Sequence, residues 1–483
     1  MLPTRSALPY LAASFLLCAG CDASTAPDET EPHLWIGEHK VVLRAGEEAR
    51  LTAIYLHSQL SGLDTVEEAA WRSSASGVLA VRRDGSVTAL APGVATVSVE
   101  HRGKRDAIEL RVIDGTPAYR TEWATVAVGS GTTCATTVEG EAYCWGDDYY
   151  GAVADGARRA WTGVHSPVRV AGGHRFAEVG IGTLHVCART PAGAVYCWGD
   201  GGAIGRPSAI SVDEPVRVDF DRPFSRLDAG ANVTCGLDVE GTAYCWGFAA
   251  SGELGDGILG LHSRDRPHPV ATDERFAQIL VGGSRVCALT ASGQAYCWGS
   301  GSHGDLGTES NETQAVPVPV SGDHIFEEIT GSSHTCGQTA AGTIHCWGAN
   351  KWHKIDGDVP AYFTPSELPP AKQFDRVIAG TVTTCGLTSD GTAHCWGLDR
   401  FGNLGAGGRA AQQCDIDLFP CSDHPLEVAG GLRFETLSLG AESSCGVTVD
   451  GALYCWGSNR RGRLGAGSLI EYSDVPVRVV DPW

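Results

Sequence analysis

The chain is poor in basic residues and has no long apolar run. Its 36 Lys and Arg residues stand against 57 Asp and Glu, a formal net charge of -21 at pH 7. Bulk charge of this sign opposes binding to nucleic acid or to an anionic membrane surface. The apolar stretch from Ala7 to Ala19 is too short for a spanning helix. These features argue against a nucleic-acid partner and against a membrane span at the N-terminus.

The common catalytic signatures are also missing. The sequence contains no Gly-x-Ser-x-Gly, His-Glu-x-x-His or Gly-Lys-Thr/Ser motif. His185 and His334 both lie just before the first cysteine of a repeat unit, and a repeated position favours a structural role. Two pairs of neighbouring aspartates occur: Asp356 with Asp358, and Asp415 with Asp417. Loop turns explain both pairs more simply than calcium does. We therefore expect no catalysis, no cofactor and no metal.

One hairpin motif occurs seven times in the chain. Cys-Trp-Gly recurs with its cysteine at Cys144, Cys197, Cys245, Cys297, Cys346, Cys395 and Cys455. In each copy another cysteine lies ten positions earlier, at Cys134, Cys187, Cys235, Cys287, Cys336, Cys385 and Cys445. A glycine lies just past the midpoint between them, at Gly140, Gly193, Gly241, Gly293, Gly342, Gly391 and Gly451. Such a fixed period indicates a repeat architecture.

The spacing of the two cysteines predicts a disulfide within each hairpin. The flanking Thr, Val, Ala and Tyr residues favour strands. A three-residue loop that ends in a left-handed Gly makes a hairpin with a G1 bulge. The even spacing then places the cysteines opposite each other at a Cα separation of about 4.5 Å, within disulfide range. Free thiols and a metal site are the alternatives, and zinc sites use cysteines two to four residues apart.

Each repeat unit contains three further elements. An opening strand such as Phe434–Gly440 precedes the hairpin, and a loop such as Gly462–Gly467 follows it. The unit ends in a strand led by proline, as in Pro476–Val479. Four strands in about 50 residues make a propeller blade. Proline suits the outer edge of a blade, where a missing N–H matters least.

Together the glycine hairpin, Cys-Trp-Gly and Gly-x-Leu-Gly-x-Gly motifs of residues 118–483 resemble the repeats of the regulator of chromosome condensation family. The resemblance implies a seven-bladed β-propeller. The eukaryotic founder of the family is a guanine-nucleotide exchange factor with a nuclear GTPase partner. An export signal and many disulfides oppose that role, so only the fold is carried over. A secreted bacterial propeller similar to the family binds β-lactamase through its loops, which implies that the scaffold serves protein binding outside cells.

The N-terminal residues resemble a bacterial lipoprotein signal. Residues 1–20 contain the apolar stretch and end before Cys21, and Ala19-Gly20-Cys21 resembles the lipoprotein cleavage box. This resemblance implies that Cys21 is lipidated, although Cys18 stands where Leu is usual. A plain secretory signal is the alternative. Residues 21–32 then form a flexible tether. Loss of Cys18 and lipidation of Cys21 leave sixteen of the 18 cysteines, all pairable, which indicates an oxidising compartment.

Residues 33–114 have no cysteine and alternate short strand-like runs with turns. This texture predicts a β-sandwich. The stretch from Ala70 to Val97 resembles the bacterial immunoglobulin-like group 2 domain. That resemblance implies a spacer or adhesive module, with Trp71 in its core.

Three loops break the repeat pattern. The sixth unit carries an insertion, Arg409–His424, with the extra pair Cys414 and Cys421. The fifth unit has Lys351–Lys354 (Lys-Trp-His-Lys) in place of the glycine motif, and the first has Asp147–Tyr150. If the three loops lie on one rim of the propeller, their aromatic residues would form a patch suited to binding a protein or glycan. The alternative is that these loops diverged without acquiring a function. The candidate binding residues are Tyr149, Tyr150, Lys351, Trp352, His353, Leu418 and Phe419.

The sequence thus predicts an all-β protein, a seven-bladed β-propeller preceded by an immunoglobulin-like β-sandwich. Our functional hypothesis is a non-enzymatic protein of the cell envelope, held by its lipid, that binds a protein or polysaccharide through propeller loops. A secreted form is the alternative location. An extracellular glycan-directed enzyme is the competing function, and nucleotide exchange the least supported one.

Overall fold

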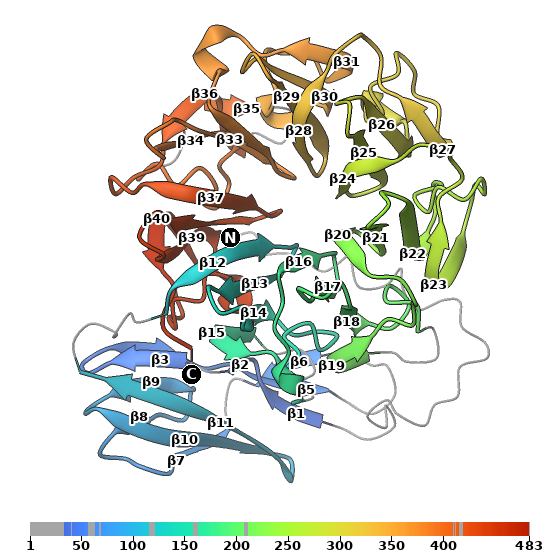
Figure 1. The fold of residues 1–483 in the computed structure, drawn as a ribbon. Coiled ribbons are helices and arrows are strands. Elements are labelled where there is room, and N and C mark those ends of the chain that lie inside the picture. Colours follow the sequence, from blue (N-terminus) through green and yellow to red (C-terminus); the bar gives the residue numbers. More distant parts are fainter. Residues whose placement is uncertain are drawn as a thin grey trace, which may run out of the picture.

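A computed structural model describes residues 33–39, 41–56, 63–66, 69–114, 121–157, 163–206, 211–408, 410, 412–414 and 419–482. Over these residues the protein is all-β, and seven sheets form a ring with a smaller group of strands beside it (Figure 1). The expected signal, Cys21 and the tether lie outside the described residues. In the described part of the chain, no helix has the length and apolar character needed to cross a membrane.

Each sheet of the ring is a blade of consecutive strands, with the first strand innermost (Figure 1). Blade 1 contains β12 (Trp123–Val128), β13 (Thr132–Thr137), β14 (Ala142–Asp147) and β15 (Gly163–Arg169). Blade 2 contains β16 (Glu178–Ile181), β17 (His185–Arg189), β18 (Val195–Asp200) and β19 (Ser211–Arg217). Blade 3 contains β20 (Phe224–Gly230), β21 (Val233–Asp238), β22 (Ala243–Ala249) and β23 (His262–Pro269). Blade 4 contains β24 (Phe276–Val281), β25 (Arg285–Thr290), β26 (Ala295–Gly299) and β27 (Gln314–Pro319). Blade 5 contains β28 (Phe326–Gly331), β29 (His334–Thr339), β30 (Ile344–Ala349) and β31 (Ala361–Glu367). Blade 6 contains β32 (Arg376–Ala379), β33 (Thr383–Leu387), β34 (Ala393–Leu398), β35 (Gln412–Cys414) and β36 (Phe419–Glu427). Blade 7 contains β37 (Phe434–Leu439), β38 (Ser443–Thr448), β39 (Leu453–Ser458) and β40 (Tyr472–Arg478).

The seven hairpin disulfides are confirmed. In blade 1, Cys134 lies directly opposite Cys144 and is bonded to it. The turn closes as predicted, since Gly140 has φ of +81° and its N–H donates to the Thr137 carbonyl at 2.8 Å. All seven pairs have Cα separations of 4.0–4.1 Å. The ten-residue spacing therefore places each pair at a close, opposed strand position.

The two glycine-containing motifs meet where neighbouring blades touch. The indole of Trp456 in blade 7 donates to the Asn403 carbonyl of blade 6 at 2.9 Å. Gly405 has φ of +68°, and a Cβ on it would lie 2.9 Å from Trp456. Leu404 and the Cys385–Cys395 disulfide pack on the same indole. Equivalent 2.9 Å indole bonds run from Trp145, Trp198 and Trp298 to the carbonyls of Arg463, Ala152 and Glu253. Each blade thus docks its Trp on the disulfide face of the blade before it.

The ring closes by this same packing. Blade 1 contains β12–β15 and blade 7 contains β37–β40, so the two ends exchange no strand among the described residues. Strand β12 packs against β37 and β38, and the Val128 N–H donates to the Ser438 hydroxyl at 3.0 Å. A side-to-side junction, and not a shared strand, therefore joins the two ends of the repeat array.

Two blades have five strands, which corrects the expectation of four strands in every unit. Strand β2 (Glu38–His39) pairs in parallel with β15 at Gly163 and Val164. It belongs to the segment predicted as a separate sandwich, but β15 is a sheet edge with free backbone groups. In blade 6 the insertion adds β35, paired with β36 beside the Cys414–Cys421 disulfide, whose Cα separation is 5.8 Å.

The remaining N-terminal strands form three small sheets around one core. The sheets are β1-β5-β6, β3-β11-β10-β7 and β4-β9-β8. Their strands are β1 (His33–Ile36), β3 (Val41–Arg44), β4 (Glu48–Arg50), β5 (Ala53–Leu56), β6 (Leu63–Val66), β7 (Ala70–Ser73), β8 (Leu79–Val81), β9 (Ser86–Ala89), β10 (Gly93–His101) and β11 (Lys104–Ile113). Trp71 lies in this core, as expected, and Leu469 of blade 7 packs against the core. The Val42 N–H also donates to the Gly467 carbonyl at 2.8 Å, so this module is docked on the ring.

Replacing Gly405 tests the blade junction. Gly405→Ala should lower the free energy of unfolding by about 2–4 kcal/mol, because the methyl group meets Trp456 at a left-handed backbone position. Gly408→Ala in the same loop is the matched control, since nothing lies within 4 Å of its added Cβ. Thermal or urea unfolding measures both. Equal unfolding midpoints for the two variants would contradict this account of the junction.

Candidate binding face

Strand order places the irregular loops on one face of the ring. Because the four strands of a blade alternate in direction, the first turn and the last loop of every blade open on the same face. We call this the loop face. All three loops that break the repeat pattern follow the third strand of their blade, so all three belong to the loop face.

The innermost strands line a channel of about 1340 Å³ to which all seven blades contribute. Side chains in its wall form hydrogen bonds with backbone groups of the neighbouring blade. The Asp228 carboxyl accepts from the Val281 N–H at 2.7 Å, and Gln278 donates to the Ile329 carbonyl at 2.6 Å. Burial raises the pKa of Asp228 to about 7. The channel wall is therefore held by hydrogen bonds, and one of them uses a carboxyl with a raised pKa.

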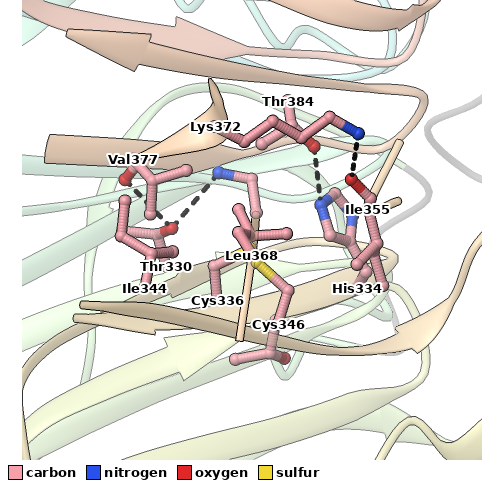
Figure 2. Close-up of a disulfide and its surroundings, with 12 residues drawn as sticks. Thr330, His334, Cys336, Ile344, Cys346, Ile355, Leu368, Lys372, Val377 and Thr384 are labelled. Atoms are coloured by element: carbon pink, nitrogen blue, oxygen red, sulfur yellow. Dashed lines mark hydrogen bonds between the residues drawn. A yellow bond between two sulfur atoms is a disulfide. The ribbon is translucent and has the colours of Figure 1, made fainter. Parts of the chain in front are cut away.

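The two histidines that precede a first cysteine join neighbouring blades. The His185 Nε2 lies 2.9 Å from the Thr234 hydroxyl, and the His334 Nε2 lies 2.8 Å from the Thr384 hydroxyl (Figure 2). Burial lowers the pKa of His185 to about 4. Both rings are buried between blades, which is the structural role that their repeated position predicts.

The altered loops of blades 5 and 6 meet on the loop face. The short helix η3 (Lys351–His353) packs against β34 and β36. The Lys351 ammonium lies 4.5 Å from the centre of the Trp352 ring. The Arg400 guanidinium lies 4.9 Å from the Phe401 ring and 4.5 Å from the Phe419 ring. We define the blade 5–6 patch as Lys351, Trp352, His353, Arg400, Phe401 and Phe419. Leu418 lies outside the described residues.

Lys354 does not belong to this patch. Its side chain is 2% exposed, so the expected surface motif ends at His353. Neighbouring Asp356 also has a structural partner, because the buried Lys372 ammonium lies 2.8 Å from its carboxylate. The same ammonium donates to the Ile355 carbonyl at 2.9 Å beside the Cys336–Cys346 disulfide (Figure 2).

Only one of the two aspartate pairs, Asp356 and Asp358, lies within the described residues. Asp358 is exposed and lies 3.4 Å from His353. Asp415 and Asp417 lie outside the described residues. Within the ranges that the structure describes, no three His, Cys, Asp or Glu side chains are grouped to hold a metal ion.

Tyr149 and Tyr150 lie on the same face but in blade 1. Their ring centres are 4.3 Å apart at a steep angle, and both side chains are half-buried. Burial raises the pKa of Tyr150 above its usual value. Nearby, Arg461 of blade 7 donates to the Asp147 carboxylate at 3.0 Å. The candidate residues therefore lie in two separate groups on one face.

A loop of blade 3 that belongs to no sequence motif is apolar and exposed. Ile258, Leu259 and Leu261 are exposed, Leu261 by 75%, and so is Phe248. Below them Asp256 is buried and pairs with Arg264 at 2.7 Å. The apolar letters of Gly257-Ile258-Leu259-Gly260-Leu261 in an otherwise polar loop were the available signal.

Comparisons with known proteins agree with this fold. The regulator of chromosome condensation (RCC1) repeat matches residues 123–152, 276–305 and 434–463 in one form and residues 292–337 and 450–482 in another. The chain is 26% identical over 205 residues to the human E3 ubiquitin-protein ligase HERC2, covering 41% of this chain and 4% of that protein. It is 28% identical over 214 residues to the mitochondrial RCC1 domain-containing protein RUG3 of Arabidopsis thaliana, covering 40% of this chain and 46% of that protein. The matches therefore span less than half of each relative.

Solved structures share the propeller. Prp20p from Saccharomyces cerevisiae superposes with a TM-score of 0.62 at 19% identity, over 75% of this chain and 88% of that one. Human WBSCR16 superposes with a TM-score of 0.61 at 19% identity, over 71% and 95%. The chain thus carries RCC1 repeats folded as a propeller of this type.

Asp228 should make stability depend on pH. Its folded-state pKa of about 7 exceeds the ordinary 3.8, so its stabilising contribution is fully present below about pH 4 and is lost as pH rises through 7. Asp228→Asn keeps a carbonyl acceptor for Val281 and should be more stable than the parent at pH 8 but not at pH 4. Urea unfolding midpoints across this range measure the effect. Exposed Asp221→Asn is the control, and a parent-like pH profile for Asp228→Asn would contradict the assignment.

Proposed function

We propose that this chain is an exported, lipid-anchored protein that binds a protein or polysaccharide through the loop face, without catalysis. One observation carries the proposal. In the blade 5–6 patch, cationic side chains from two neighbouring loops stack on aromatic rings. Arg and Trp, both present there, are the residues most enriched at binding hot spots.

The chemistry of the patch suits recognition. Cation–π contacts hold flat rings in place, so less side-chain entropy is lost on binding. The patch contributes Lys351 and Arg400 on a chain of formal net charge -21. A local cationic site on an acidic protein favours a partner with acidic or polar groups and disfavours non-specific binding.

The disulfides support export. Eight disulfides occur among the described residues, and such bonds form and persist in oxidising compartments. Ala19-Gly20-Cys21 supports a lipid anchor on Cys21. The N-terminal module, which we take as immunoglobulin-like of group 2, is docked on blade 1 through β2. It would hold the propeller at a set distance from the membrane.

Structurally similar proteins support protein binding as a function of this fold. The report on yeast Prp20p describes its binding to Gsp1p and histones. For this chain we carry over protein binding and leave nucleotide exchange aside, since eight disulfides suit no cytosolic partner.

The channel gives the competing glycan-directed enzyme little support. Of the four described carboxyl groups that line it, Glu327 is exposed and the other three have partners. Glu178 pairs with Arg189 at 2.9 Å, and Glu328 pairs with Arg376 at 3.1 Å. Asp228 accepts two backbone N–H bonds and has a raised pKa. These groups serve the channel wall.

The patch can be tested by removing one stack from each loop. Trp352→Ala combined with Arg400→Ala should weaken binding by at least about tenfold, because both anchors are lost. The purified chain is first screened on polysaccharide and envelope-protein panels, and the dissociation constants of its hits are then compared. Arg460→Ala, at the position in blade 7 equivalent to Lys351, is the matched control and should bind like the parent. Unchanged affinity in the double variant would remove the patch from the site.

The anchor is tested separately. Cys21→Ser should leave the chain without lipid, because serine offers no thiol for acylation. Labelled palmitate incorporation and membrane fractionation in the bacterial host measure this. Recovery of the variant in the membrane fraction, with the same label as the parent, would contradict lipidation at Cys21.

A further inference from the structure

A polar side chain joins neighbouring blades at three junctions of the ring. It belongs to the residue two before the first cysteine of a hairpin, and it bonds the threonine hydroxyl just before the first cysteine of the next blade. The pairs are His185 with Thr234, Arg285 with Thr335, and His334 with Thr384. Between blades 3 and 4 these two positions hold Val233 and Val286, whose side chains cannot form a hydrogen bond. This junction therefore lacks the polar link.

A backbone bond is missing at the same junction. Between blades 2 and 3 the Thr183 N–H donates to the Ala231 carbonyl at 2.8 Å. Between blades 4 and 5 the Gly283 N–H donates to the Ser332 carbonyl at 3.3 Å. The corresponding residues between blades 3 and 4 are Ala231 and Gly283, both within the described ranges, and no such bond joins them. The first turns of blades 3 and 4 are therefore joined less completely than those of the neighbouring pairs.

A pocket of about 200 Å³ lies at this junction. It is lined by the first turns of blades 3 and 4 and by residues at the start of the last loop of blade 3, so it belongs to the loop face. No residue of the blade 5–6 patch lines it. Pockets for drug-sized ligands begin at about 300 Å³. This pocket therefore has room for a single small ring.

Two polar side chains in the pocket lining can still form hydrogen bonds with a ligand. The Asn232 side chain is half-buried and bonds to no group of the described residues. The Glu253 Oε2 accepts from the Ala250 and Ser251 N–H groups at 3.1 Å and 2.7 Å. The Glu253 Oε1 has no partner in the described part of the chain, and it is not sealed from solvent. An amide and a carboxylate oxygen are thus available.

Arg285 and Phe248 also line the pocket. The Arg285 guanidinium is already bonded to blade 5, through the Ser332 carbonyl at 2.8 Å and the Thr335 hydroxyl at 2.6 Å, so it forms a fixed wall. Because Glu253 lies in the same lining, the pocket carries one charge of each sign, which favours a neutral ligand. The Phe248 side chain is 41% exposed, so its ring is available to stack on that ligand.

A neutral sugar ring matches these groups. Sugar hydroxyls both donate and accept hydrogen bonds, so they can bond to an amide and to a carboxylate oxygen. The C–H groups on one face of a sugar pack well on an aromatic ring, because the face of that ring carries negative partial charge. A single sugar also has the size that the pocket volume requires.

We propose that the pocket between blades 3 and 4 binds one neutral sugar residue of a glycan. Phe248 stacks on the sugar ring, and Asn232 and Glu253 bond its hydroxyls. The proposal rests on the proposed function and deepens it, because it names a glycan as a ligand of the loop face. The pocket is separate from the blade 5–6 patch, so either can fail without the other.

Titration calorimetry of the full exported chain with methyl glycosides of neutral hexoses and N-acetylhexosamines tests the pocket. Saturable binding of at least one glycoside is expected, with a dissociation constant on the order of 1 mM for a ligand of this size. Phe248→Ala and Asn232→Ala should each weaken that binding by about tenfold, because the stacking surface or the amide is lost. Phe363→Ala, at a side chain that is 38% exposed and outside the pocket, is the matched control and should bind like the parent.

One further variant separates the pocket from the patch. Trp352→Ala combined with Arg400→Ala should bind the glycosides like the parent, even where it loses the partner of the patch. Butylamine and acetate, which carry only a cation or only an anion, are the comparison probes. No saturable glycoside binding, parent-like affinity in Phe248→Ala, weakened glycoside binding in the double variant, or binding of butylamine or acetate alone would each overturn the proposal.

Discussion

The packing of a buried tryptophan indole on the preceding blade holds the ring together. Each such Trp is fully buried, and at four junctions its N–H donates to a carbonyl in the loop of the preceding blade. The indole approaches that loop most closely where the second glycine of Gly-x-Leu-Gly carries no side chain, as at Gly255, Gly307, Gly405 and Gly465. The disulfide of the preceding blade packs on the same indole and stiffens the surface that receives it. At these four glycine junctions the contact needs both motifs at once.

Where the contact is altered, other groups take its place. In blade 5 the loop has Asp356, and in blade 1 Ala154, where the other five blades have that glycine. The buried Lys372 ammonium compensates, since it bonds Ile355 and Asp356 and lies 5.7 Å from the Trp396 ring. The altered loop carries Trp352 of the proposed patch and the buried Lys354.

Repeated positions could be interpreted from the sequence, and unrepeated ones only in part. Spacing alone paired Cys134 with Cys144 and its six counterparts, because a two-residue strand period leaves the opposed cysteines no other geometry. Composition did not reveal β2, since its pairing depends on an edge more than a hundred residues away. It also placed Lys354 at the surface, because a charged letter in a loop does not show which way its side chain points. Phe248 and Leu261 were overlooked because they belong to no motif.

The sequence by itself determined the blade, the disulfides and the order of the units, since local strand periodicity and turn chemistry depend on near neighbours. Only the tertiary structure decided which loops lie side by side, how the ring closes and where the N-terminal module docks. It also decided that Lys354 faces Ser333 while Arg463 faces Glu442. The physical reason is that these contacts join residues from different strands or blades, and their distances follow from the packing of whole sheets.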